Sequence, residues 1–179
     1  LVLDPQAALQ IEAELRLDDA TVETRYTVGA TEFRREAFAS FPAQVLVVRL
    51  TATRPGQLTF SIGIDSPQQR TRVESTAPDT LQLTGQIQPR QNPARSWTGS
   101  WDEPGLRFAA VLRVLTEGGS VREDGDRLAI SGADAATIVF SGATSFRTYR
   151  DIGGDALARA REILTRASAQ PYNRVRQAH

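Results

Sequence analysis

Hydrophobic and polar residues alternate along most of the chain between residues 11 and 144, with the two-residue period of a half-buried β-strand. The segment VETRYTV (residues 22–28) alternates in this way, and LTFSIGID (residues 58–65) repeats the pattern. Between them, QVLVVRLTA (residues 44–52) is almost continuously apolar, which indicates a strand that is buried on both faces. The pattern therefore predicts a protein built mainly of short β-strands.

Turn residues separate these segments at regular intervals. Gly29–Ala30 predicts a tight turn, Pro55–Gly56 within RPGQ predicts a type II turn, and Asp124–Gly125 within EDGDR predicts a hairpin. We expect about ten or eleven strands at spacings of roughly 8–12 residues. Such a series is typical of a large antiparallel β-sandwich or barrel.

The C-terminal region departs from the strand pattern. GDALARAREILTRASAQ (residues 154–170) carries an apolar stripe at helical spacing, and Asp155 is a suitable N-cap residue. These features predict a helix of about 14 residues. Pro171 then begins a second helical segment, so we expect a helical connector after the sandwich.

The second departure is IQPRQNPARSWTGSWDEPG (residues 87–105), a polar segment with three prolines and both tryptophans. It is predicted to be a long loop, and long loops in compact domains are often functional. Its substrate-binding candidates are Trp97, Trp101, Asn92, Arg95 and Asp102. An indole face can stack on the C–H face of a sugar while polar neighbours bind the hydroxyls. Alternatively, the indoles anchor the loop on the sandwich.

Composition limits the classes of function. The chain has 179 residues and no cysteine, which excludes disulfides, thiolate zinc sites and a cysteine nucleophile. Its 21 basic and 21 acidic residues cancel and form no block, so neither nucleic acid nor a membrane is an expected partner. The chain contains no methionine and no signal peptide. We therefore expect its N-terminus to be internal to a longer polypeptide.

No catalytic set is found. The one histidine, His179, is the last residue, and a terminal histidine is expected to be disordered rather than part of a catalytic triad or a metal site. The acidic pairs Asp18–Asp19 and Asp124–Asp126 fall at predicted turns, where aspartate bonds the local backbone. No phosphate-binding glycine loop is present, and we expect no cofactor and no metal.

One long run, residues 23–68, resembles the N-terminal β-domain of glycoside hydrolase family 95, the α-L-fucosidases. The positions that fit the family pattern are Phe33, Arg35, Glu36, Phe38, Ala39, Ser40, Pro42, Gln44, Val45, Val47, Val48, Arg49, Leu50, Thr51, Pro55, Gly56, Asp65, Ser66 and Pro67. LQLTGQ, GLRFAAVLRVLTEGGSV and ADAATIVFSGATSF are similar to later family segments, and the C-terminal tail is similar to its helical linker. The first 20 residues match loosely, so we expect the domain to be incomplete at its start.

The resemblance implies a galactose-mutarotase-like β-supersandwich over residues 1–150 and a helical linker over residues 151–179. It implies that the linker leads to an (α/α)6 catalytic barrel absent from this chain, which would be the domain's intramolecular partner. The parent enzyme would hydrolyse terminal α-1,2-linked L-fucose of oligosaccharides with inversion, using a general acid and an amide–carboxylate set that handles the attacking water. Those catalytic residues would lie on the barrel, with none in this chain. The resemblance also implies a secreted or periplasmic parent.

Two alternatives remain open from the sequence. The chain could be a free-standing carbohydrate-binding sandwich that uses the tryptophan segment. It could also be the accessory domain of another (α/α)6-barrel glycosidase or of a glycoside phosphorylase.

Overall fold

The computed structural model describes residues 11–68, 70–87 and 105–179. These residues form strands and helices in the order β1 (Ile11–Arg16), β2 (Thr21–Val28), β3 (Thr31–Ser40), β4 (Val45–Ala52), β5 (Leu58–Gly63), β6 (Arg70–Ala77), β7 (Thr80–Gln86), β8 (Arg107–Glu117), β9 (Ser120–Asp124), β10 (Arg127–Ala133), β11 (Ala135–Thr144), α1 (Ala156–Ser168) and α2 (Tyr172–Ala178). The predicted mainly antiparallel β fold with C-terminal helices is confirmed.

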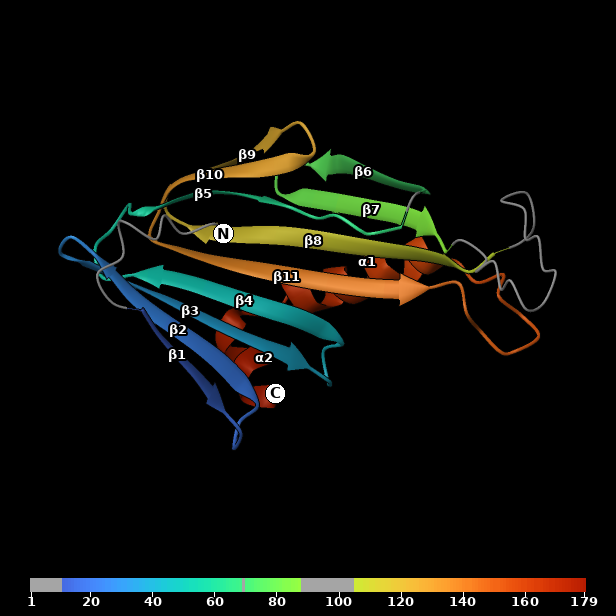
Figure 1. The fold of residues 1–179 in the computed structure, drawn as a ribbon, viewed down its shortest axis with the longest axis horizontal. Coiled ribbons are helices and arrows are strands. Elements are labelled where there is room, and N and C mark those ends of the chain that lie inside the picture. The colour runs from blue at the N-terminus through green and yellow to red at the C-terminus, as the bar shows by residue number, and fades with distance from the viewer. Residues whose placement is uncertain (1–10, 69, 88–104) are drawn as a thin grey trace, which may run out of the picture.

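The strands form two sheets (Figure 1). Eight of them make a large sheet in the order β1-β2-β3-β4-β11-β8-β7-β6, and three make a small sheet in the order β5-β10-β9. All pairings in both sheets are antiparallel. The small sheet packs on one face of the large sheet, and α1 and α2 pack on the other. The molecule therefore has three layers, with the large sheet in the middle.

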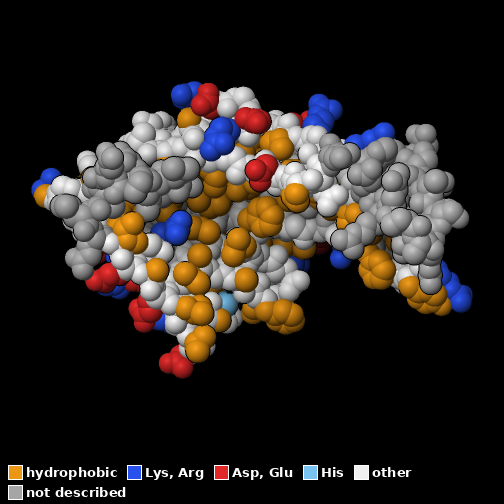
Figure 2. All heavy atoms as spheres, viewed as in Figure 1, with side chains coloured by type: hydrophobic (Ala, Val, Ile, Leu, Met, Phe, Trp, Pro, Cys, Tyr) orange, Lys and Arg blue, Asp and Glu red, His pale blue; other side chains and the backbone are white. Residues whose placement is uncertain are grey.

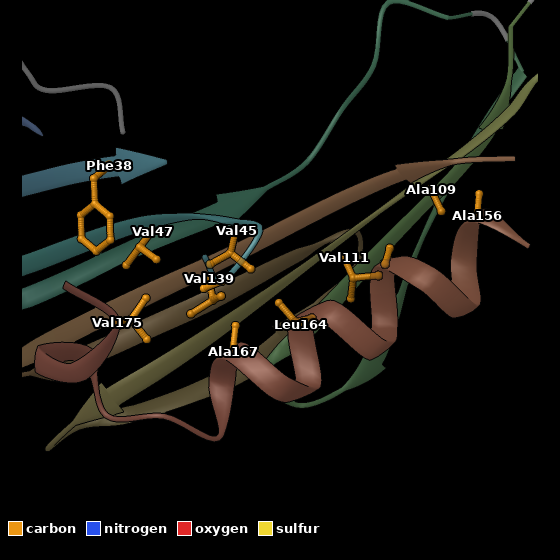
Figure 3. Packing of buried hydrophobic residues seen from close by; sticks show 12 residues of the cluster. Phe38, Val45, Val47, Ala109, Val111, Val139, Ala156, Leu164, Ala167 and Val175 are labelled. Atoms are coloured by element: carbon orange, nitrogen blue, oxygen red, sulfur yellow. The ribbon is translucent and has the colours of Figure 1, made fainter. Parts of the chain in front are cut away.

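Each interface has its own hydrophobic core. The core between the two sheets includes Leu58 and Leu128 of the small sheet with Leu81 and Leu112 of the large one. The core between the helices and the large sheet is shown in Figure 3, where side chains of α1 and α2 point at those of β3, β4, β8 and β11. Alternation along the strands explains both, because successive side chains of one strand enter opposite cores.

The small sheet covers only part of the face on which it lies. Leu15, Val22, Ala37, Val48, Ile138 and Val114 are register partners in one row across the large sheet. Along this row the exposed fraction of the side chains is 1% at Val114 and 8% at Ile138, but 45% at Val22 and 62% at Leu15. Figure 2 shows hydrophobic side chains gathered on this face of the molecule. We call the side chains of Leu15, Val22 and Leu46 the open apolar face.

The strand β4 corrects one expectation. Its apolar run predicted burial on both faces, but Leu46 is 43% exposed. Val45 and Val47 pack against the helices and Leu50 packs against the small sheet. Leu46 lies on the same face as Leu50 but does not belong to the core between the sheets, so the small sheet leaves it exposed.

Helix α1 forms as predicted. The side chain of Asp155 accepts a hydrogen bond from the backbone N–H of Ala158 at 2.9 Å, which caps the helix N-terminus. Its buried residues, Ala156, Ala160, Leu164 and Ala167, follow helical spacing and face the large sheet. Pro171 immediately precedes α2, also as predicted. That these helices lead to a catalytic barrel stays a prediction.

The predicted turns are present. Gly56 has a φ of 69°, which suits the third position of the expected type II turn. The hairpin between β9 and β10 turns at Gly125, whose φ is 66°, while Asp124 still belongs to β9. In the described ranges, neither helix is long and apolar enough to cross a membrane.

Candidate functional site

The tryptophan segment lies largely beyond the part of the chain that the structure describes. Trp97, Trp101, Asn92, Arg95 and Asp102 all fall within residues 88–104, so their role stays a prediction. The base of the segment is described. The N–H of Ile87 donates to the carbonyl of Leu106 at 2.9 Å, which joins the chain just after β7 to the chain just before β8. The segment therefore starts and ends where the paired strands β7 and β8 end and begin, at one end of these strands.

A hollow of about 360 Å³ lies beside this base. It is lined by residues of β7 and β8 and by Gly153–Leu157, which lead into α1. The ring of Phe108 covers Gly85, where an added Cβ would lie 2.4 Å from the ring's Cζ. Arg107 lines the hollow beside this ring. An aromatic ring with an adjacent guanidinium can contact a sugar, and the hollow is the described feature nearest to the base of the tryptophan segment.

A second candidate is the junction where α2 meets β3. Glu36 is a buried carboxylate on β3, and it accepts hydrogen bonds from three side chains. The donors are Tyr172 Oη at 3.0 Å, Arg176 Nε at 2.5 Å and Arg34 Nη2 at 2.9 Å. Burial, followed by the nearby Glu36 carboxylate, raises the pKa of Tyr172 to about 12. The phenol therefore stays protonated at neutral pH and donates a hydrogen bond to Glu36.

Arg176 extends the junction beyond Glu36. Its Nη2 donates to Asp19 Oδ2 at 2.6 Å, in the turn between β1 and β2. A hydrogen bond from Thr21, followed by that from Arg176, lowers the pKa of the Asp19 carboxyl. The guanidinium of Arg176 also lies over the ring of Phe38, 5.6 Å from its centroid. One side chain of α2 thus contacts charged and aromatic groups from two parts of the large sheet.

His179 corrects an expectation from the sequence. Its ring stacks on Phe38 with 4.8 Å between the centroids, so the residue is placed against the sheet rather than disordered. Tyr172 lies against Phe38 as well, at 6.2 Å between ring centroids. Phe38 therefore holds α2 at both of its ends.

Behind the junction lies a second buried carboxylate, that of Glu23 on β2, which is 3% exposed. It forms ion pairs with Arg25 and with Arg34 Nη2, the latter at 2.5 Å. Burial alone would raise the pKa of Glu23, but the hydrogen bonds from Arg34 and Arg25 outweigh burial and lower it. Because Arg34 binds both Glu23 and Glu36, it links β2 to the helical junction.

Sequence reasoning missed this junction. It did not select Glu36 or Arg176. A signal was present, since Glu36 shares a strand face with Phe38 at a spacing of two residues, and a charge on a buried face needs a partner.

The junction is suited to holding elements together rather than to catalysis. Glu23 and Glu36 are both engaged by arginines, which leaves neither poised to exchange protons with a substrate. The described residues contain no group of three or more His, Asp or Glu side chains that could hold a metal ion.

Comparisons with known proteins agree with the fold. The chain is 32% identical over 142 residues to Alpha-L-fucosidase 2 of Arabidopsis thaliana, a match that covers 74% of this chain and 17% of that protein. Among solved structures it resembles a protein described as a kojibiose phosphorylase, from the human microbiome, with a TM-score of 0.57 and 10% identity. That likeness covers 94% of this chain and 24% of the other, and it shows the fold alone. The chain thus spans less than a quarter of the length of either protein.

A family model matches most of the chain. The model described as glycosyl hydrolase family 65, N-terminal domain, matches residues 2–149, which takes in every strand of both sheets. The predicted glycoside hydrolase N-terminal domain is thereby confirmed at this coarser level. The chain belongs to the family of glycosyl hydrolase family 65 N-terminal domains.

Proposed function

We propose that this chain is the non-catalytic N-terminal domain of a larger glycoside hydrolase, and that the parent enzyme is an α-L-fucosidase of the family-95 type. The identity to Alpha-L-fucosidase 2 supports the fucosidase assignment. The family-95 pattern in residues 23–68 points the same way. In this proposal the catalytic carboxyl groups belong to an (α/α)6 barrel outside this chain.

The observation that carries the accessory role is the fixed position of the C-terminal helices. Helix α1 is buried along one side against β8 and β11, and α2 is held through Glu36, Arg176 and Phe38. A connector attached in this way does not pivot freely on the sandwich, because moving it would break the hydrogen bonds of Tyr172 and Arg176 to Glu36 and the apolar contacts of the helices. A domain that sets the orientation of a neighbouring barrel needs such a rigid connection.

The open apolar face supports a larger parent. Soluble proteins rarely leave a contiguous apolar patch exposed unless something binds it. We propose that the rest of the polypeptide covers Leu15, Val22 and Leu46 in the parent enzyme. The matched relatives have ample additional length to do so, since this chain spans 17% and 24% of them.

The tryptophan segment is the proposed link to substrate. Its base lies beside the hollow at Phe108 and Arg107, near the start of α1. We propose that Trp97 and Trp101 reach the mouth of the barrel and contact the oligosaccharide there. A secreted or periplasmic location for the parent is part of the same proposal and is supported by the family resemblance.

Assaying the full-length parent enzyme on a panel of terminally fucosylated oligosaccharides tests the proposal. We expect release of L-fucose, fastest from α-1,2 linkages, with the β-anomer appearing first in a proton NMR time course because the reaction inverts the anomeric centre. Release of a sugar phosphate only when phosphate is present would replace the hydrolase with a phosphorylase. Absence of both products would contradict the fucosidase assignment.

The role of the segment is tested separately. The double variant Trp97→Ala, Trp101→Ala should lower kcat/KM for the oligosaccharide by about tenfold or more if the indoles stack on sugar. Phe41→Ala, which removes an exposed aromatic side chain from the turn between β3 and β4, serves as the control. Equal kcat/KM in both variants and in the unaltered enzyme would show that the indoles do not contact substrate.

A further inference from the structure

A polar cleft of about 370 Å³ opens between α2 and the strands β3 and β4. Its lining includes Arg16, Arg34, Arg49 and Arg176, with Glu36 as the one carboxylate among the lining residues. This cleft lies on the helix-bearing face of the large sheet, away from the hollow beside the tryptophan segment. Its volume is within the range of small-molecule sites.

The four arginines come from separate parts of the chain and are held in place. Arg16 and Arg176 both contact Asp19, and Arg34 and Arg176 both contact Glu36. Shared carboxylates bring these guanidiniums close to one another, although like charges repel. The cleft is therefore pre-organised, because a ligand would not have to gather the arginines itself.

Arg49 forms another wall of the cleft. Its guanidinium lies 5.2 Å from the centroid of the Tyr172 ring, and its Nη1 donates to Thr137 at 2.6 Å. Its ion-pair partner, Glu117, is 66% exposed, so the carboxylate can move away from the arginine at little cost.

The guanidinium groups of the cleft can donate hydrogen bonds beyond those of their ion pairs. The two ion pairs of Arg34 are both made by Nη2. Its Nε is buried with no hydrogen-bond partner in the described residues, so an anion would contact the exposed end of the guanidinium instead. The side chain of Arg34 is nevertheless 42% exposed, and that of Arg16 is 34% exposed. Arginine forks match the geometry of carboxylate and phosphate oxygens. Of the carboxylates that pair with these arginines, Glu36 lines the cleft, whereas Asp19, Glu23 and Glu117 are outside its lining.

We propose that this cleft binds a small oxyanion group, of the carboxylate or phosphate class, between Arg16, Arg34, Arg49 and Arg176. In this proposal the anion accepts hydrogen bonds from guanidinium N–H groups that the existing ion pairs do not use. Such a group could belong to a soluble ligand or to an acidic side chain from the remainder of the polypeptide. The inference does not depend on fucosidase activity, and its test uses no glycoside.

Inorganic phosphate is the probe. Nitrogen-15 spectra of the arginine Nε–H groups are recorded for the 179-residue protein while phosphate replaces chloride at constant ionic strength. The resonances of the cleft arginines should shift in a saturable manner. Those of Arg72 and Arg122, which lie in exposed ion pairs elsewhere, should not. Equal, non-saturating shifts of all arginines would overturn the proposal.

Two charge-matched variants of α2 localise the binding. Asn173 lines the cleft, and Gln177 lies on the same helix outside the lining. Both substitutions, Asn173→Asp and Gln177→Glu, convert an exposed amide into a carboxylate and disturb no described ion pair. Asn173→Asp should weaken phosphate binding about tenfold, because the new carboxylate repels the anion or takes its place. Gln177→Glu should weaken it by less than about twofold. Equal weakening by both would contradict binding in the cleft.

The same variants distinguish the two sources of the oxyanion in the full-length polypeptide. If a soluble ligand is the natural occupant, phosphate raises the Tm of the full-length protein as it does that of the 179-residue protein. If an acidic side chain occupies the cleft, phosphate leaves the full-length Tm unchanged and Asn173→Asp lowers it. Fucosidase activity is measured in parallel, so failure of one proposal is separable from failure of the other.

Discussion

Arg176 and Glu36 are separated by 140 residues in the chain, and Nε of Arg176 donates to Oε1 of Glu36 at 2.5 Å. This contact joins the last helix to the third strand of the sandwich. Because Glu36 is buried with α2 in place, removing one of its partners by substitution would leave a buried charge less well compensated. The connector is thus fixed by electrostatics as well as by the apolar packing of α1.

The hydroxyl of Tyr172 should contribute measurably to this attachment. Tyr172→Phe removes one hydrogen bond to the Glu36 carboxylate and should lower the free energy of unfolding by about 2 kcal/mol. Urea unfolding measures the change. Tyr149→Phe is the control, since Tyr149 is exposed and its substitution should change stability by less than about 0.5 kcal/mol. Similar effects in both variants would show that the bond to Glu36 adds nothing.

Stability should fall in acid partly because of Glu23. Its pKa in the folded protein lies below the ordinary value of 4.5, so its ion pairs stabilise the fold above about pH 4.5. That stabilisation is lost as pH falls through the lower folded pKa. Glu23→Gln should therefore be less stable near neutral pH and should show a weaker pH dependence between about pH 5 and pH 3. Urea midpoints across this range provide the measurement. Glu123→Gln, at an exposed site, is the control and should keep the pH dependence of the unaltered protein. If the stability of Glu23→Gln varied with pH in the same way as that of Glu123→Gln, Glu23 would not contribute to the loss of stability in acid.

Two glycines with similar backbone angles should respond very differently to alanine. Gly29 has a φ of 60° and open space around it, whereas Gly119 has a φ of 62° and an added Cβ would lie 2.4 Å from the carbonyl oxygen of Ser131. Gly29→Ala should cost about 1 kcal/mol from backbone strain alone. Gly119→Ala should cost about 1–3 kcal/mol more, because the β9–β10 hairpin must shift. Thermal unfolding compares the two variants, and equal losses would mean that the hairpin has room for the methyl group.

A charged substitution on the open apolar face should change the Tm of the 179-residue protein and of the full-length parent by different amounts. Leu46→Asp should barely change the Tm of the 179-residue protein, because the side chain is 43% exposed there. In the full-length parent it should lower the Tm clearly, since the aspartate would be buried beneath the covering segment. Leu17→Asp, in the exposed turn after β1, should be tolerated in both. Tolerance of Leu46→Asp in the parent would show that this face stays uncovered.

Local patterns account for most of what the sequence predicted. Alternation identified the strands, and the N-cap Asp155 with its apolar stripe identified α1 within one or two residues of its bounds. These features depend on neighbours in the chain, so they can be read without the tertiary structure. The type II turn at Gly56 was predictable for the same reason.

The junction required information that no local pattern holds. The partners of Glu36 include Arg176 and Tyr172, which lie on one helix, 140 and 136 positions further along the chain. Likewise, the exposure of Leu46 depends on how far the small sheet extends over β4, which the apolar run cannot reveal. Long-range pairing, not local propensity, decides both features.

The most direct test of the accessory-domain account compares the 179-residue protein with its full-length parent on an α-1,2-fucosylated oligosaccharide. Both are assayed at equal molar concentration, and free L-fucose is quantified over time. The account predicts that the parent releases fucose and that the 179-residue protein releases none. Fucose released by the 179-residue protein itself would contradict the account, because it would place a catalytic set within these residues.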